Sequence, residues 1–187
     1  MAPTAWRGKV LRQLTDLFLV DAASYTDDQV AVFDDLISHL IEKIDRRVLV
    51  ELSNRLAQVE NAPGKVVGTL ARHGDTLVAA PLLEKSALLT DADLVEIADK
   101  ERRDPKLLSA IAARAQLSEA VTDVLIRRGN TALARKLIDR IDAPLSESSF
   151  ARLVTSIEND KELAAAIAKR SDLPAELRPW LDAALEQ

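Results

Sequence analysis

The sequence contains no cysteine among its 187 residues. It therefore has no disulfide bond, no iron–sulfur cluster held by thiolates and no thiolate zinc site. Histidine occurs twice, as His39 and His73. Two histidines so far apart argue against a structural or catalytic zinc site. We expect neither a metal ion nor a cofactor.

Aromatic side chains and glycine are also scarce. Phe, Trp and Tyr make up 3% of the chain, and glycine occurs five times. A core must then be built from Leu, Ala, Val and Ile, and few positions suit the tight turns of β-hairpins. Alanine and leucine are strong helix formers. The composition predicts an all-α protein.

Long apolar runs are missing as well. No run approaches the roughly 20 residues that span a bilayer. Lys9 and Arg12 precede an apolar stretch, but Asp16 interrupts it and no clean cleavage site follows. An amphipathic helix is therefore favoured over a signal peptide, and a cytoplasmic protein is expected. The net charge of −5 argues against a general nucleic-acid binder.

Two amphipathic helices are predicted at the N-terminus, one over residues 4–20 and one after Thr26. Apolar residues recur at helical spacing in both. Thr26 suits an N-cap, and Gln29 completes a capping box. We interpret residues 1–45 as a helical hairpin. Because a hairpin cannot bury both of its faces alone, it must pack on the next segment or on a second copy, which makes it a candidate homodimer contact.

A repeat of 28 residues follows. It is marked by a leucine at the start of the second helix of each pair, in Leu89-Thr90, Leu117-Ser118, Leu145-Ser146 and Leu173-Pro174. We predict an α-solenoid of short HEAT-like helix pairs over residues 46–187, because short helices bury their faces only against stacked neighbours. Its units are a degenerate one at 46–73 and four clear ones at 75–103, 104–129, 130–159 and 160–187.

The helix boundaries are marked by local signals. Asp45 and Ser118 are expected N-caps, and so is Asn130. Asp104-Pro105 combines a cap with a proline at the first helical position. Gly129 is expected to end a helix in a left-handed C-terminal cap.

Basic residues recur near the end of the first helix of each clear unit, as Lys85, Arg114, Arg140 and Arg170. In a stack they would form a row that could bind an anion or an acidic partner. The interpretation that we favour is structural. Lys and Arg suit helix C-termini and can bridge to acidic residues of the neighbouring unit.

His39 lies on a predicted helix. A phosphotransfer role is conceivable if Asp35 or Glu42 sets the tautomer of its imidazole. The sequence around His39 has no motif of a phosphotransfer domain or a histidine kinase, so an ordinary surface histidine is favoured. The chain also has no glycine-rich phosphate loop and no nucleophile elbow. No catalytic residue is predicted, and the chain is expected not to be an enzyme.

Several segments resemble one bacterial family. They are VAAPLLEKSALLTDADLVEIA (78–98), IAARAQLSEAVTDVLIRRGN (111–130) and DKELAAAIAKRSDLP (160–174), joined by FDDLISHLIEKID (33–45) and RLAQVENAP (55–63). They are similar to the domain of unknown function 2336 family, which is best represented in alphaproteobacteria. The resemblance implies a HEAT-like helical-repeat protein without an assigned enzyme activity or catalytic residues. Many members continue beyond the DLP motif, so it also implies a short member or part of a longer protein.

Three functions are compatible with these patterns. The leading hypothesis is a non-enzymatic scaffold that binds a protein partner in bacterial signalling or regulation. The first alternative is a nucleic-acid-binding repeat protein whose basic row follows phosphates, although the acidic balance and the scarcity of aromatic side chains argue against it. The second alternative is a phosphotransfer module that uses His39.

Overall fold

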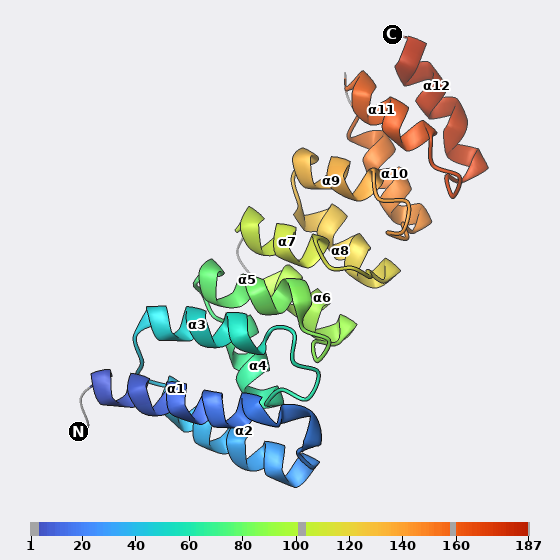
Figure 1. Ribbon diagram of the computed structural model, residues 1–187. Coiled ribbons are helices and arrows are strands. Elements are labelled where there is room, and N and C mark those ends of the chain that lie inside the picture. Colours follow the sequence, from blue (N-terminus) through green and yellow to red (C-terminus); the bar gives the residue numbers. More distant parts are fainter. Residues whose placement is uncertain (1–3, 101–103, 158–159, 187) are drawn as a thin grey trace. The chain divides into compact units, whose positions relative to one another are not determined.

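The computed structural model describes residues 4–100, 104–157 and 160–186. In these residues it is all-helical, with twelve α-helices, two short 3₁₀-helices and no strand (Figure 1). The prediction of an all-α protein is confirmed. The chain divides into two compact units, Met1–Thr90 and Asp91–Gln187.

The first unit contains five α-helices in its described residues. They are α1 (Thr4–Val20), α2 (Asp27–Ile41), α3 (Arg46–Leu56), α4 (Gly64–Ala71) and α5 (Thr76–Lys85), with the 3₁₀-helix η1 (Ala22–Ser24) after α1. The α1–α2 hairpin packs on the rest of the unit, since α1 contacts α3 and α2 contacts α4. The boundary expected after residue 45 therefore falls inside this unit.

Local signals determine where the hairpin turns. Thr26 and Gln29 form the predicted capping box at the start of α2. Just before it, Tyr25 stacks on Phe18 with ring centroids 5.7 Å apart. Phe18 also meets the edge of Phe33 at 5.1 Å. Three of the chain's few aromatic side chains thus hold α1 against α2.

The second unit contains seven α-helices in its described residues. They are α6 (Asp91–Lys100), α7 (Pro105–Ala112), α8 (Glu119–Arg128), α9 (Thr131–Ile138), α10 (Glu147–Thr155), α11 (Lys161–Ala168) and α12 (Arg178–Glu186), with the 3₁₀-helix η2 (Ala175–Leu177) before α12. Helices α7, α9 and α11 pack in one row, and α6, α8 and α10 pack in another (Figure 1). The starts of α6, α8, α10 and η2 lie 28 residues apart.

Polar side chains cap several of the helices as predicted. Asp45 caps α3, and Asp104 caps α7 with Pro105 in its first turn. Ser118 caps α8, where its hydroxyl accepts a hydrogen bond from the backbone N–H of Val121 at 3.4 Å. The helix pair expected at 75–103 is divided at Thr90, with α5 in the first unit and α6 in the second. The unit ends expected at residues 103 and 159 lie outside the described residues.

Gly129 does not adopt the predicted left-handed cap. Its φ of −74° and ψ of 174° are extended values that any residue adopts. The glycine is needed for space instead, because an added Cβ would lie 2.5 Å from the carbonyl oxygen of Leu125 and 2.7 Å from the Leu133 side chain. The prediction placed the helix end correctly and gave the wrong reason for the glycine.

Candidate functional site

Arg170 lies two residues after the end of α11 and reaches back to the turn that follows α9. Its Nη1 group donates to the carbonyl oxygens of Ile138 at 3.2 Å and Arg140 at 2.8 Å. Its Nη2 group donates to the carbonyl oxygen of Ala143 at 2.8 Å. These carbonyls lie at and beyond a helix C-terminus, where main-chain acceptors lack partners within the helix. Arg170 thus ties the end of the first helix of one pair to the next pair.

Arg140 repeats the arrangement one helix pair earlier. Its Nη1 group donates to the carbonyl oxygens of Ala112 at 2.7 Å and Arg114 at 2.8 Å, beyond the end of α7. Its Nη2 group donates to the carbonyl oxygen of Ala115 at 3.2 Å. Each arginine thus binds the main chain of the preceding one, since Arg140 binds that of Arg114 and Arg170 binds that of Arg140.

An aspartate two residues later completes each arrangement. Arg170 donates from Nε and Nη2 to the two carboxylate oxygens of Asp172, at 2.8 Å and 2.7 Å. Arg140 pairs with Asp142 in the same way, with its Nε at 3.2 Å. Hydrogen bonding from the guanidinium lowers the pKa of both Asp172 and Asp142.

These bonds use the full donor capacity of both side chains. A guanidinium has five N–H donors, and five hydrogen bonds leave each of Arg140 and Arg170. Arg170 is only 6% exposed and also lies over the Phe150 ring, with its Cζ 5.8 Å from the ring centroid. A buried charge is tolerated when its hydrogen-bonding capacity is filled in this way. Neither side chain has a donor left for an external anion.

The other two members of the predicted row differ from this pair. Arg114 follows α7 at the corresponding place, but Gln116 occupies the position of the aspartate. Partial burial lowers the pKa of Arg114, and the nearby Asp91 opposes that shift. Lys85 is exposed at the end of α5 and belongs to the first unit. The structure therefore brings together three of the four residues.

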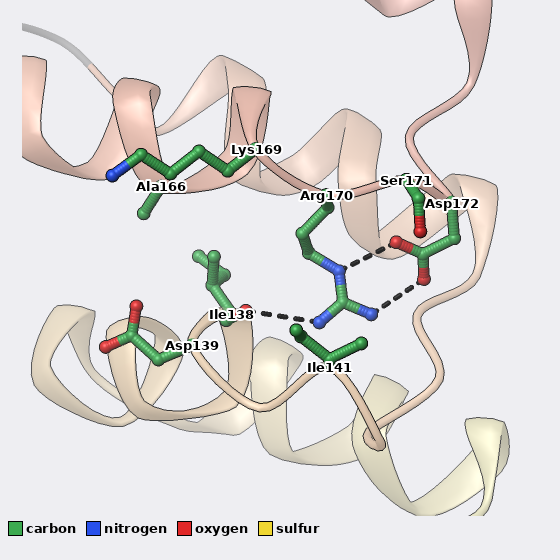
Figure 2. A pocket seen from close by; sticks show the side chains of 8 residues that line it. All are labelled: Ile138, Asp139, Ile141, Ala166, Lys169, Arg170, Ser171 and Asp172. Carbon is green, nitrogen blue, oxygen red and sulfur yellow. Dashed lines mark hydrogen bonds and ion pairs between the residues drawn. The ribbon is translucent and has the colours of Figure 1, made fainter.

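A recess of about 320 Å³ lies beside Arg170, between the turn after α9 and the end of α11. We call it the α9–α11 recess. It is lined by Ile138, Asp139, Ile141, Ala166, Lys169, Arg170, Ser171 and Asp172. Figure 2 shows the Arg170–Asp172 pair at one side, and the side chains of Lys169 and Asp139 at the other. Ile141 is 87% exposed.

The α9–α11 recess is lined by apolar and charged side chains. Apolar side chains form its middle, and three exposed charged residues flank them, Lys169, Asp139 and Asp172. Ser171 is the hydroxyl-bearing residue among the described lining residues, and no histidine lies beside it there. The fixed Arg170 forms a rigid wall, because its hydrogen bonds hold it in place. Such a recess suits an apolar side chain of a partner together with polar groups of its main chain.

His39 lies on the surface of α2, in its last turn. One of its two expected carboxylate partners is engaged elsewhere, because Asp35 accepts a hydrogen bond from Nζ of Lys65 at 2.7 Å. In the parts of the chain that the structure covers, no group of three or more metal-binding side chains could hold an ion. Over those same parts, none of the helices has both the length and the apolar character needed to cross a membrane.

Two kinds of residue escaped sequence reasoning. Asp142 and Asp172 could have been found, since each stands two residues after a recurrent arginine. Asp34 could not. This buried residue of α2 accepts hydrogen bonds from the main-chain N–H groups of Lys65 and Val66, both at 2.9 Å, and so caps α4 from a distant part of the sequence.

Comparison with known proteins gives a family. A family model described as "Uncharacterised protein conserved in bacteria (DUF2336)" matches residues 78–187. The match covers the segments at 78–98, 111–130 and 160–174, and begins after those at 33–45 and 55–63. No curated protein and no solved structure matches the chain. The chain belongs to the bacterial family of domain of unknown function 2336.

Proposed function

We propose that this chain is a non-enzymatic, HEAT-like helical-repeat scaffold that binds a protein partner through the α9–α11 recess. The observation that carries the proposal is the exposure of Ile141, at 87%, beside a recess of about 320 Å³. An exposed apolar side chain with a polar rim is typical of a protein-binding surface. A role in bacterial signalling or regulation, in the cytoplasm, is part of the same proposal.

The hydrogen bonds of Arg170 support this role physically. They attach the turn after α9 to the end of α11, so the walls of the α9–α11 recess are fixed before a partner arrives. A preformed site avoids part of the entropy cost of ordering an interface. Asp139 and Lys169 offer one acceptor and one donor group at its rim, which suits the main chain of a bound segment.

The two alternatives gain no support from particular contacts. Nucleic-acid binding would need free cationic groups, whereas all guanidinium donors of Arg140 and Arg170 are engaged inside the unit. Phosphotransfer would need a polar partner for His39, and Asp35 is paired with Lys65. A contact between the N-terminal hairpins of two copies would give an assembly that contains two α9–α11 recesses.

A capture experiment with matched variants tests the scaffold role. The full chain, Ile141→Asp and the control Leu77→Asp would each be immobilised and exposed to the same bacterial lysate. Leu77 is a suitable control because it is apolar, 57% exposed and located in α5. We expect a protein that is retained by the wild type and by Leu77→Asp and is lost with Ile141→Asp. Identical recovery by all three proteins would contradict the proposal.

A further inference from the structure

The α1–α2 hairpin concentrates the exposed apolar side chains of the first unit. Nine large apolar residues are exposed in the described chain, and five of them lie on these two helices. They are Trp6, Leu17 and Val20 on α1, and Val32 and Leu36 on α2, all between 50% and 83% exposed. We call these five residues the hairpin face.

Helical geometry places the α1 residues of this set on one side. At about 100° per residue, Trp6 and Leu17 lie within roughly 20° of each other around the axis of α1. The buried residues Leu11 and Phe18 lie roughly 120–140° away, and the half-buried Leu14 lies between the two groups. The apolar part of α1 is thus wider than the part that is buried.

Helix α2 has the same pattern. Val32 and Leu36 lie within roughly 40° of each other, and the buried Ile37 and Ile41 lie roughly 140–180° from Val32. The half-buried Phe33 and Leu40 fall between them. Phe33 meets Phe18 across the hairpin, which identifies the side of each helix that faces the other.

These positions put both exposed groups on the same side of the hairpin. Around each helix axis, the buried side chains come first, then those that face the other helix, and then the exposed apolar ones. The sense of rotation is the same in both helices when each is viewed from its N-terminus. Because α1 and α2 run antiparallel, the two sets of side chains are mirror images of each other across the hairpin. The buried sides meet α3 and α4, so the hairpin face lies on the opposite side.

The charges of the two helices are opposite. Helix α1 carries three basic residues (Arg7, Lys9, Arg12) and one acidic residue (Asp16), for a net charge of +2. Helix α2 carries four acidic residues (Asp27, Asp28, Asp34, Asp35) and no Lys or Arg, for a net charge of −4. Four of these charges are used inside the first unit, because Asp34 caps α4 and the side chains of Arg12, Asp16 and Asp35 pair with α3 and α4. The remaining charges are still opposite in sign, with Arg7 and Lys9 on α1 and Asp27 and Asp28 on α2. Opposite charges on the two helices favour a second copy that a two-fold axis places with α1 on α2.

The size of the hairpin face fits a modest dimer. Helices of 17 and 15 residues are about 25 Å and 22 Å long, and packed neighbours lie about 8–10 Å apart. The flat face then measures roughly 25 by 20 Å, and its accessible surface is larger because side chains project from it. This is near the lower end of specific interfaces, about 600 Å² per partner.

We infer that the hairpin face binds the hairpin face of a second copy of this chain, with α1 of each copy packed on α2 of the other. The four helices form a bundle whose core contains Leu17 and Val32 of both copies. A two-fold axis parallel to the helices produces this arrangement. This self-association is independent of the proposed partner site in the second unit.

The oligomeric state of the full chain tests the inference. Sedimentation velocity over a range of concentrations should show a dimer that dissociates on dilution. Leu17→Glu and Val32→Glu should each raise the dimer dissociation constant by at least about ten-fold, because each places two carboxylate groups, one from each copy, in an apolar interface. Leu77→Glu, outside the hairpin, should leave the dissociation constant unchanged. Circular dichroism and thermal melting should show all three variants to be folded.

Two outcomes would overturn the inference. One is a wild-type chain that stays monomeric at every concentration, and the other is a dimer that Leu17→Glu leaves intact.

Discussion

The two units each bury one charged side chain at a helix end, and they use opposite charges to do so. In the described residues these are Asp34 in the first unit and Arg170 in the second. Asp34 accepts hydrogen bonds from two N–H groups at the start of α4. Arg170 donates to three carbonyl groups at and after the end of α9. A carboxylate complements the positive end of a helix and a guanidinium the negative end.

The two arrangements differ because a carboxylate and a guanidinium form different numbers of hydrogen bonds. Helix α4 begins after Pro63, which has no side chain that can cap it. One carboxylate from α2 satisfies two of the free N–H groups there and needs no further partner. A guanidinium has five donors, so Arg170 needs a second acceptor group beside the carbonyls, and Asp172 supplies it. The second arrangement can therefore recur as a short local motif, as it does at Arg140 and Asp142.

Removal of Arg170 should have the largest effect. In Arg170→Met, three carbonyl groups lose a charged donor and Asp172 loses its partner. We expect the free energy of unfolding to fall by about 3–5 kcal/mol, as for other buried charge pairs that lose one partner. Urea unfolding followed by circular dichroism measures this change.

Two variants calibrate that result. Lys169→Met removes an exposed neighbouring cation and should change stability by less than about 0.5 kcal/mol. Arg140→Met removes the equivalent arginine, whose side chain is 25% exposed, and should cost less than Arg170→Met. If Arg170→Met were no more destabilising than Lys169→Met, the arginine would not hold the helix end.

Much of the fold follows from local sequence signals, because helix caps and helix-forming composition act over a few residues. Ser118 and Asp104 cap the helices that they were predicted to cap. The recurrence of Arg140 and Arg170 also favoured a role at helix ends. The expected partners were acids of the neighbouring unit, whereas the structure shows main-chain carbonyls and an aspartate two residues away.

What the sequence did not predict depends on contacts between distant segments. Asp34 caps α4 by binding Lys65 and Val66, which follow it in the sequence by 31 and 32 positions, and no repeat or motif marks these contacts. The α9–α11 recess lies between two helix ends that the predicted repeat stacks, but the repeat does not predict the space left between their side chains. The space requirement of Gly129 depends on Leu133 in the next helix. Local patterns carry no information on such distances.

Removal of Asp34 should have the second-largest effect. In Asp34→Ala, the main-chain N–H groups of Lys65 and the buried Val66 lose their acceptor, so we expect a loss of about 1–3 kcal/mol in the free energy of unfolding. The exposed neighbour Asp35 provides the control, since loss of its surface pair with Lys65 should cost less than about 1 kcal/mol. Equal losses in the two variants would mean that the first unit does not depend on its buried carboxylate.

The smallest effect concerns the carboxylate of the Arg170 arrangement. Asp172, the partner of Arg170, can be protonated at low pH. Hydrogen bonding from Arg170 lowers the pKa of Asp172 in the folded chain. The unfolded chain, with a carboxyl pKa near about 3.9, therefore binds the proton more readily. The stabilisation by Asp172 is complete above that value and is lost as the pH falls through the folded pKa.

A comparison of wild type and Asp172→Asn across pH tests this step. The wild type should be more stable by at most about 1 kcal/mol between pH 5 and 7, since the Asp172 side chain is 43% exposed and partly screened by solvent. The difference should shrink as the pH falls below about 4, because the wild-type carboxylate becomes protonated. Other acidic residues titrate in both proteins and cancel. A difference that stays constant down to pH 2 would show that the carbonyl groups alone hold Arg170 in place.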